Sequence, residues 1–441
     1  MDEVCLLSDA FPPIIDGVVN AVTNYGKNLA ADGWQVSAVV PDYEGADDSA
    51  FPYPVIRYPS LDFRDSIGYT VGNPFDIATI RGLSQRKISI LHSHCPFAST
   101  YLGRSLREKL DVPLILTYHT KYDLDIANAI HIKAAKDSAV RALVENVSAC
   151  DELWVVSRGA GENIKSLGYE GEYIVMENGV DLPKKRAEAS LVREVTKDVP
   201  LPEGVPVFLF VGRLMWYKGI RIILDALAVL KDARKEFRMV FVGTGTDEAE
   251  IRAYAESLNL MDKVIFTGPV RGRDALSAWY TRADLFLFPS TFDTNGLVVR
   301  EAAACSLGSV LVRGSCAAEG VTDGVDGLLI AENAASLAVC LSDVMKRPEV
   351  MKQIGEAAAR NIYISWEDAV KKAEERYRIV LDRYLSGHTS RKARRGHDLF
   401  HYSAELMETL DRAARLRDRA YTLAADTQRA LTRGSDLWQD F

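Results

Sequence analysis

One repeated pattern constrains the fold of this chain more than any other: a short apolar run, then a loop, then a helical pattern. The clearest copy begins at Leu285-Phe-Leu-Phe288, continues through a polar loop from Pro289, and enters a helical pattern over residues 296–307 that stops at Gly308. A short apolar run ended by proline is typical of a buried parallel strand. Similar runs occupy residues 4–7, 113–118 and 207–211. The pattern predicts an α/β fold with doubly wound parallel sheets.

The length predicts more than one domain, because 441 residues exceed what one ordinary core accommodates. A polar, proline-bearing stretch over residues 182–206 separates two series of strand and helix patterns and is interpreted as an interdomain linker. We therefore expect an N-terminal domain over residues 1–185 and a second domain over 200–365. We predict a helical tail over residues 386–441, which has a basic start at Arg391 and apolar residues at three- and four-residue steps.

Composition excludes several classes of protein. A net charge of −8 argues against a general nucleic-acid binder, which needs a basic surface. The six cysteines are scattered without a C-x-x-C pair, which indicates a reducing cytoplasm. No apolar stretch reaches the roughly 18 residues that a membrane-spanning helix requires, so any membrane contact is expected to be peripheral.

The loop after residue 288 has the chemistry of a ligand site. It lies at a helix N-terminus, where the backbone N–H groups of about Asn295, Gly296 and Leu297 could receive an anion or sugar hydroxyls. Asp293 stands before the helix and Glu301 about a turn and a half inside it, so both carboxylates could face one ligand. The alternative is a helix cap at Asp293 and a solvated Glu301.

A second loop, residues 212–219, carries paired cations. Arg213 and Lys218 flank the start of the next helix and could converge on two phosphates, with the helix dipole adding to their field. The alternative is that both are ordinary surface residues.

The first half offers a glycine and three histidines near expected strand ends. Gly17 begins a helix after the first strand, where a diphosphate could approach the backbone. His92 and His94 could share one strand face, but no further Asp, Cys or His completes a recognisable metal-ligand set. His119 follows the strand at 113–118, and its alternative role is a histidine satisfied within a loop.

Six of these residues, in this order, resemble the signature of retaining nucleotide-sugar glycosyltransferases of family 4, which have the GT-B fold. They are Gly17, His119, Arg213, Lys218, Asp293 and Glu301. The resemblance covers about residues 1–385 and implies two Rossmann-like domains facing across a cleft, with a helix over 366–385 that crosses back to the first domain. It departs at Asp293, where the family usually has Glu.

The resemblance also implies roles. Glu301 would hold the ribose diol, and Asp293 would meet hydroxyls of the donor sugar together with the Asn295–Leu297 backbone. Arg213 and Lys218 would hold the diphosphate leaving group, near the Gly17 loop. The backbone at Val270 would hold the base, and His119 would face the anomeric carbon. No metal and no cofactor would be required.

The same resemblance favours transfer of glucose from UDP-glucose with retained configuration. The string Thr117-Tyr-His-Thr120 followed by Lys121 is similar to the subgroup that glycosylates diacylglycerol, which would place the protein at the inner face of the membrane. Lys133, Lys136 and Arg141 could lie on anionic lipid, although nearby acids favour a solvated face.

Other functions stay open at this point. They are transfer to a soluble sugar or polysaccharide, a sugar-nucleotide epimerase, a phosphorylase, and a non-catalytic nucleotide-sugar-binding protein. The tail could dock on its own chain, join two copies or touch lipid, and its acids favour protein packing.

Overall fold

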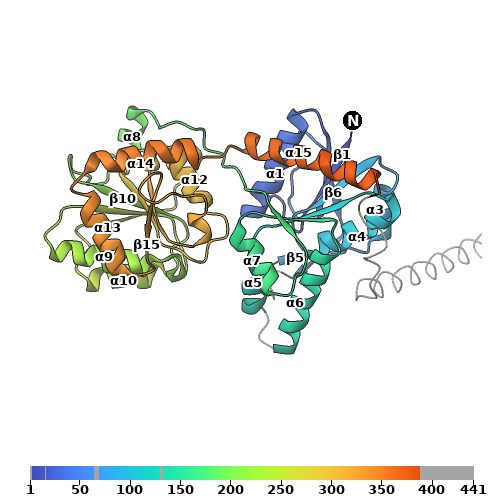
Figure 1. Cartoon of the computed structure of the whole chain (residues 1–441), viewed down its shortest axis with the longest axis horizontal. Helices are drawn as coiled ribbons and strands as arrows, with labels where there is room; N and C mark the ends of the chain where they lie inside the picture. Colours follow the sequence, from blue (N-terminus) through green and yellow to red (C-terminus); the bar gives the residue numbers. More distant parts are fainter. Residues whose placement is uncertain (1, 15, 64–68, 130–132, 388–441) are drawn as a thin grey trace, which may run out of the picture.

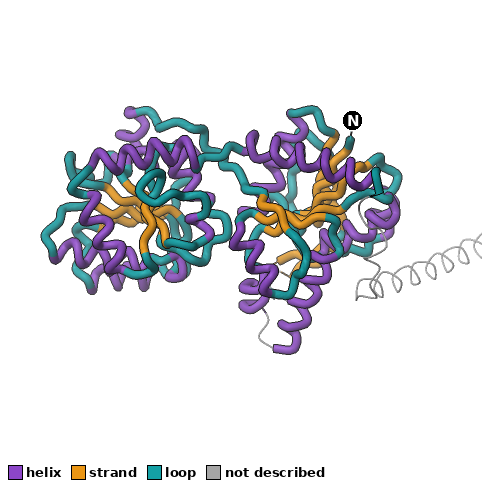
Figure 2. Tube along the Cα trace, viewed as in Figure 1, coloured by secondary structure: helices purple, strands orange, loops and turns teal. Residues whose placement is uncertain are grey.

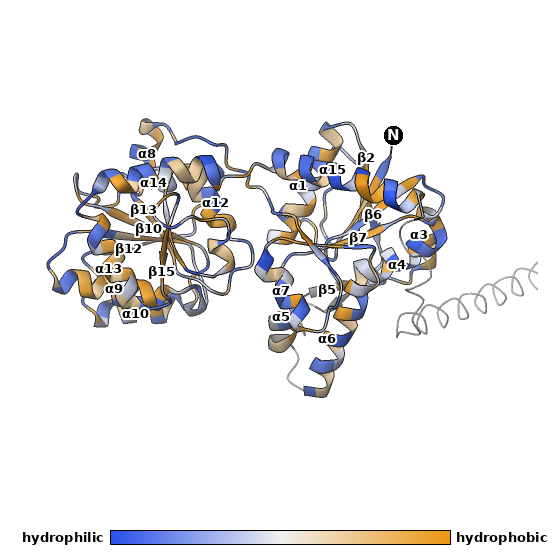
Figure 3. Ribbon diagram, in the orientation of Figure 1, coloured by the Kyte–Doolittle hydropathy of each residue, from blue (hydrophilic) through white to orange (hydrophobic). Residues whose placement is uncertain are grey.

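Two α/β lobes make up the protein, and the chain crosses between them twice (Figure 1). The computed structural model describes all residues except 1, 15, 64–68, 130–132 and 388–441. In each lobe the strands form the centre and helices lie on both sides, as Figure 2 shows. The strands are apolar, whereas many helices carry hydrophilic residues on their outer faces (Figure 3).

The N-terminal lobe contains a seven-stranded parallel sheet in the order β3-β2-β1-β6-β7-β8-β9. Its strands are β1 (Glu3–Leu7), β2 (Gln35–Pro41), β3 (Val55–Tyr58), β6 (Ile88–Ser93), β7 (Leu114–Tyr118), β8 (Glu152–Val155) and β9 (Tyr173–Val175). Its helices are α1 (Gly17–Ala31), α3 (Ile77–Leu83), α4 (Ala98–Leu110), α5 (Tyr122–Ala129), α6 (Lys133–Ser148) and α7 (Arg158–Ser166). All five residues of β1 are buried, which explains its continuous apolar run.

The C-terminal lobe contains a six-stranded parallel sheet in the order β12-β11-β10-β13-β14-β15. Its strands are β10 (Val207–Val211), β11 (Arg238–Val242), β12 (Val264–Gly268), β13 (Leu285–Phe288), β14 (Ser309–Val312) and β15 (Leu328–Ile330). Its helices are α9 (Ile220–Asp232), α10 (Glu248–Ser257), α11 (Arg273–Arg282), α12 (Leu297–Ala304), α13 (Ala334–Val344) and α14 (Pro348–Asn361), with short 3₁₀ turns η1 (Trp216–Lys218) and η2 (Cys316–Ala318). Both predicted Rossmann-like sheets are confirmed.

The last described helix, α15 (Trp366–Leu385), returns to the N-terminal lobe. It lies near α1 and β1 in Figure 1, and its residues Trp366, Val370 and Tyr377 belong to the same buried cluster as Val4 and Leu6 of β1. The structure therefore contains the crossing helix that the resemblance implies at residues 366–385.

Some elements differ from the sequence-based expectation. The segment that carries Lys133, Lys136 and Arg141 forms α6, which follows the shorter helix α5, and residues 130–132 between the two helices are outside the described chain. The predicted linker contains α8 (Ala189–Thr196), which packs on α11. An antiparallel hairpin of β4 (Ser60–Phe63) and β5 (Tyr69–Gly72) was not predicted. The predicted tail from His388 lies outside the described residues.

Over the described part of the chain, every helix is too short or too polar to span a bilayer.

Candidate active site

Loops at the carboxyl ends of the two sheets meet between the lobes. The hydroxyl of Thr294, in the loop after β13, donates to the backbone carbonyl of His119, directly after β7, over 3.2 Å. The carboxylate of Glu319 accepts the backbone N–H groups of Arg158 and Gly159 at the start of α7 over 2.6 and 2.7 Å. Because ligands of doubly wound sheets bind at this edge, the meeting of two such edges marks the candidate site.

Lys218 and Asp293 form an ion pair in this region. Lys218 Nζ lies 2.9 Å from Asp293 Oδ2, and the two side chains are only 13% and 20% exposed. The pairing depends on Gly219, which has φ +79° and whose Cβ, if present, would lie 2.1 Å from the Pro289 carbonyl oxygen. Only glycine permits this approach without displacing the backbone, so the two predicted loops come together there.

Asp293 also organises its own loop. Its Oδ1 accepts the backbone N–H groups of Asn295 at 3.1 Å and Gly296 at 2.7 Å. Burial alone would raise the pKa of Asp293, but the Lys218 ammonium and these two N–H groups outweigh it and hold the pKa below its usual value. Asp293 is therefore an ionised carboxylate next to a cation at neutral pH.

This arrangement leaves a specific set of polar groups for a ligand. Two of the three predicted backbone N–H donors, those of Asn295 and Gly296, bind Asp293, while Leu297 is the first residue of α12. The side-chain Oδ1 and Nδ2 of Asn295 are buried and have no hydrogen-bond partner among the described residues. Sequence reasoning selected Asn295 for its backbone, and the structure adds its side-chain amide.

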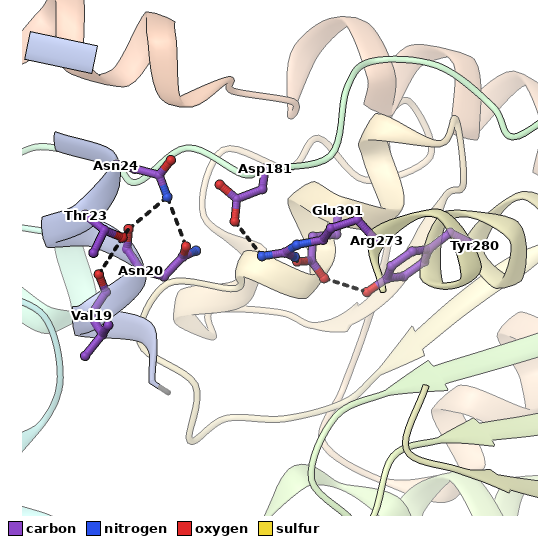
Figure 4. Close-up of polar contacts among 8 residues, drawn as sticks. All are labelled: Val19, Asn20, Thr23, Asn24, Asp181, Arg273, Tyr280 and Glu301. Atoms are coloured by element: carbon purple, nitrogen blue, oxygen red, sulfur yellow. Dashed lines mark hydrogen bonds and ion pairs between the residues drawn. The ribbon is translucent and has the colours of Figure 1, made fainter. Parts of the chain in front are cut away.

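Glu301 is held by α11 (Figure 4). Its Oε1 lies 3.0 Å from Arg273 Nη1 and its Oε2 accepts the Tyr280 hydroxyl at 3.0 Å. Burial raises the pKa of Glu301, although Arg273 and Tyr280 oppose the shift. Arg273 also pairs with Asp181. Tyr280 is buried, and sequence reasoning found neither its hydrogen bond to Glu301 nor the contact of Arg273 with the same carboxylate.

The other predicted residues are more open. Arg213 is exposed, and its guanidinium has no hydrogen bond or ion pair with the rest of the described chain. Gly17 is the first residue of α1, capped by Asp16, with open space where a side chain would extend. Val270 is half-buried in the loop between β12 and α11. Each is located where a ligand could reach it.

The three histidines form one buried stack. His92 bonds to Tyr377 and Thr117 through its two ring nitrogens, and His94 Nδ1 lies 3.0 Å from His119 Nε2. Burial lowers the pKa of His119 to about 3, so its imidazole is neutral at physiological pH. Within the described residues there is no cluster of three or more His, Cys, Asp or Glu side chains that could hold a metal ion.

Comparison with known proteins agrees with the two-domain fold. The family described as Glycosyltransferase Family 4 matches residues 15–184, and that described as Glycosyl transferases group 1 matches residues 192–361. An alpha-monoglucosyldiacylglycerol synthase of Acholeplasma laidlawii is 23% identical over 367 residues, which are 81% of this chain and 91% of that protein. A D-inositol 3-phosphate glycosyltransferase 2 of Catenulispora acidiphila is 30% identical over 286 residues, 62% of this chain and 66% of that protein.

Solved structures share the fold. The sucrose-phosphate synthase of Thermosynechococcus elongatus superposes with a TM-score of 0.69 at 18% identity, covering 87% of this chain and 100% of that one. Anabaena Alr3699/HepE in complex with UDP superposes with a TM-score of 0.68 at 17% identity, covering 86% and 100%.

Two Rossmann-like domains whose strand ends meet beside the Lys218–Asp293 ion pair and Glu301 define the class of GT-B glycosyltransferases. Within that class, the chain belongs to glycosyltransferase family 4 and resembles its glycolipid glucosyltransferases.

Proposed function

We propose that this protein is a retaining glucosyltransferase that transfers glucose from UDP-glucose to a hydroxyl of a membrane lipid such as diacylglycerol. One observation supports the donor part of the proposal. Asp293 and Glu301 lie on one strand-loop-helix unit, β13 to α12, and Lys218, from the loop after β10, forms an ion pair with Asp293 there. A cation for phosphate, an ionised carboxylate for sugar hydroxyls and a carboxylate for a ribose diol are the groups that a nucleotide sugar requires.

The reaction needs charge stabilisation more than a nucleophile. The bond between the anomeric carbon and the phosphate oxygen breaks, the acceptor oxygen bonds to the same face of that carbon, and the departing phosphate oxygen takes the acceptor's proton. Lys218 and Arg213 would stabilise the negative charge that develops on the diphosphate. His119, neutral because of its burial, would face the positive charge at the anomeric carbon without opposing it. The proposed mechanism assigns none of these steps to a metal ion or a cofactor.

Similarity to known proteins supports a membrane lipid as the acceptor. The relative from Acholeplasma laidlawii is named for glucosylating diacylglycerol, and it is matched over 91% of its length. On α6, Lys133 and Arg141 are exposed, so they could contact the anionic lipid of the cytoplasmic leaflet. We therefore place the protein at the inner face of the membrane as part of this proposal.

A soluble acceptor is the second candidate. It is favoured by the 30% identity to a protein named D-inositol 3-phosphate glycosyltransferase 2, whose named substrate is a water-soluble phosphate.

Release of nucleoside diphosphate from a panel of nucleotide sugars tests both candidates. Wild type, Glu301→Gln and Glu236→Gln are compared with and without diacylglycerol vesicles, in the presence and absence of EDTA. Glu236 is a matched control because its carboxylate pairs with Lys263 on the opposite, amino-terminal side of β11.

We expect vesicle-stimulated UDP release from UDP-glucose that survives EDTA. Glu301→Gln should lower it about 100-fold or more, because a neutral amide cannot accept both ribose hydroxyls as a carboxylate does. Glu236→Gln should match wild type. Release without vesicles but stimulated by inositol phosphate would move the acceptor to the soluble class, and phosphate-dependent or donor-isomerising activity would identify a phosphorylase or an epimerase. Nucleotide binding without turnover would refute transfer itself.

A further inference from the structure

The ion pair between Arg273 and Glu301 is unusual for its place in the fold. Arg273 is the first residue of α11, preceded by Gly272 as N-cap. The positive end of the helix dipole disfavours a cation there. The guanidinium nevertheless forms ion pairs here, with Glu301 on one side and Asp181 on the other (Figure 4). Two carboxylates therefore fix a cation at an otherwise unfavourable position.

The hydrogen-bonding capacity of this group is only partly used. A guanidinium has five N–H donors. Among the described residues, Arg273 donates one hydrogen bond to Glu301 and one to Asp181. Each oxygen of Glu301 accepts one hydrogen bond, from Arg273 or from Tyr280, which leaves a second lone pair on each. The Arg273 side chain is 48% exposed, so a ligand can reach these groups, whereas that of Glu301 is 13% exposed.

A cis-diol matches this pattern of donors and acceptors. Each of its hydroxyls can donate to one Glu301 oxygen and accept an N–H from the neighbouring guanidinium. A lone carboxylate would satisfy only the hydroxyl protons and leave the hydroxyl oxygens to water.

We propose that Arg273 is a second ribose-binding residue of the donor site, whose guanidinium donates to the hydroxyls that Glu301 accepts, and that Asp181 is its positioning residue. This inference rests on the proposed function, since it takes the ligand to be a ribonucleoside diphosphate sugar.

Asp181 is suited to positioning because its backbone is anchored. The preceding residue, Val180, donates its N–H to the Ile364 carbonyl over 3.0 Å, which pairs the two segments that cross between the lobes. The Asp181 carboxylate, 23% exposed, therefore holds the outer edge of the guanidinium from a fixed point. Tyr280 holds Glu301 from the other side, on the same helix as Arg273.

The test is calorimetric binding of UDP and of 2′-deoxy-UDP to the full chain. The variants are Arg273→Gln, Asp181→Asn and the control Arg347→Gln. Arg347 is 52% exposed and pairs with Asp343 one helical turn away, so it matches Arg273 in exposure and partner but is remote from the site.

Wild type and Arg347→Gln should prefer UDP over 2′-deoxy-UDP by about tenfold or more, which is the value of a hydrogen bond to a charged group. Arg273→Gln should weaken UDP binding about tenfold while barely changing 2′-deoxy-UDP binding, so that the preference falls below about threefold. A merely structural role would weaken both ligands equally. Asp181→Asn leaves Arg273 and Glu301 in place and should reduce the preference in the same direction, which keeps the test valid if Arg273→Gln does not fold.

The outcomes separate the two proposals. If wild type prefers UDP and Arg273→Gln retains that preference, the role of Arg273 is refuted while the proposed function stands. If wild type binds both nucleotides equally, the assignment of Glu301 and Arg273 to ribose fails while transfer itself stands. If it binds neither nucleotide, both proposals fail.

Discussion

Replacing Lys218 with methionine removes the cation of the proposed donor site and leaves a buried carboxylate without its partner. Methionine has nearly the length of the lysine stem, so the substitution removes the charge and little of the packing. Lys218 and Asp293 are 13% and 20% exposed and 2.9 Å apart, which makes this a largely buried ion pair. Breaking such a pair typically destabilises a protein by about 3–5 kcal/mol.

Two features of the site place the expected loss of unfolding free energy near the lower end of that range. Asp293 keeps its hydrogen bonds from the Asn295 and Gly296 backbone. In addition, the carboxyl of the variant can protonate, which limits the penalty at pH 7 to about 4 kcal/mol, given an unfolded pKa of about 3.9. We therefore expect the free energy of unfolding to fall by about 3 kcal/mol at pH 7.

The penalty should depend on pH with a defined sign. In wild type the pKa of Asp293 is held below its usual value, so its stabilising contribution is present above the unfolded pKa and is lost as the pH falls below it. In Lys218→Met, burial is no longer opposed by the cation, and the pKa should rise. At pH 5 protonation limits the penalty to about 1.5 kcal/mol, so the two proteins should converge as the solution becomes more acidic.

Urea denaturation at pH 7 and pH 5 measures both values, and release of UDP from UDP-glucose measures activity. Loss of a preorganised charge-stabilising group should lower turnover about 10²- to 10³-fold. The control is Lys371→Met, whose ammonium also pairs with a carboxylate, that of Glu367 one helical turn away, but is 53% exposed, and which should change neither property measurably. An equal penalty at both pH values, or one no larger than that of the control, would refute the reasoning.

Two further predictions concern the scaffold. Three buried histidines should make the fold acid-sensitive, because their pKa values are lowered by burial and the unfolded chain binds more protons than the folded one below about pH 6.5. They are His92, His94 and His119. Lowering the pH from 7.5 to 5.5 should remove about 4 kcal/mol through them, offset by about 2 kcal/mol from Asp9, whose pKa burial raises to about 7. Urea denaturation of His92→Gln should then show a pH dependence about 1.3 kcal/mol smaller than wild type over this interval, and an unchanged dependence would count against it. Gly219→Ala should destabilise the protein by several kcal/mol and reduce turnover, because its Cβ would lie 2.1 Å from the Pro289 oxygen. Gly314→Ala, with a similar φ of +81° but open space, should lose only about 1–2 kcal/mol, so equal losses in thermal denaturation would contradict the steric explanation.

The sequence alone determined the α/β alternation, both sheets and the position of the loop after β13 that carries Asp293. This was possible because each depends on local patterns. The strand at 285–288, the turn at Pro289 and the helix after Gly296 are specified by neighbours within about twenty residues. A short apolar run of this kind indicates a buried strand. The ion pair of Lys218 with Asp293 was not predicted, although both residues follow strands, β10 and β13, whose carboxyl ends lie at one edge of the sheet.

Only the tertiary structure decided which side chains complete the site. Arg273 meets Asp181 across 92 positions of sequence, and Glu319 meets the start of α7 across 160. No periodicity relates such residues, because their contact follows from how two domains and their crossing segments pack. The same reason explains why sequence reasoning missed Tyr280: helical spacing can predict that a residue is buried, whereas a hydroxyl directed at Glu301 depends on how α11 lies against α12.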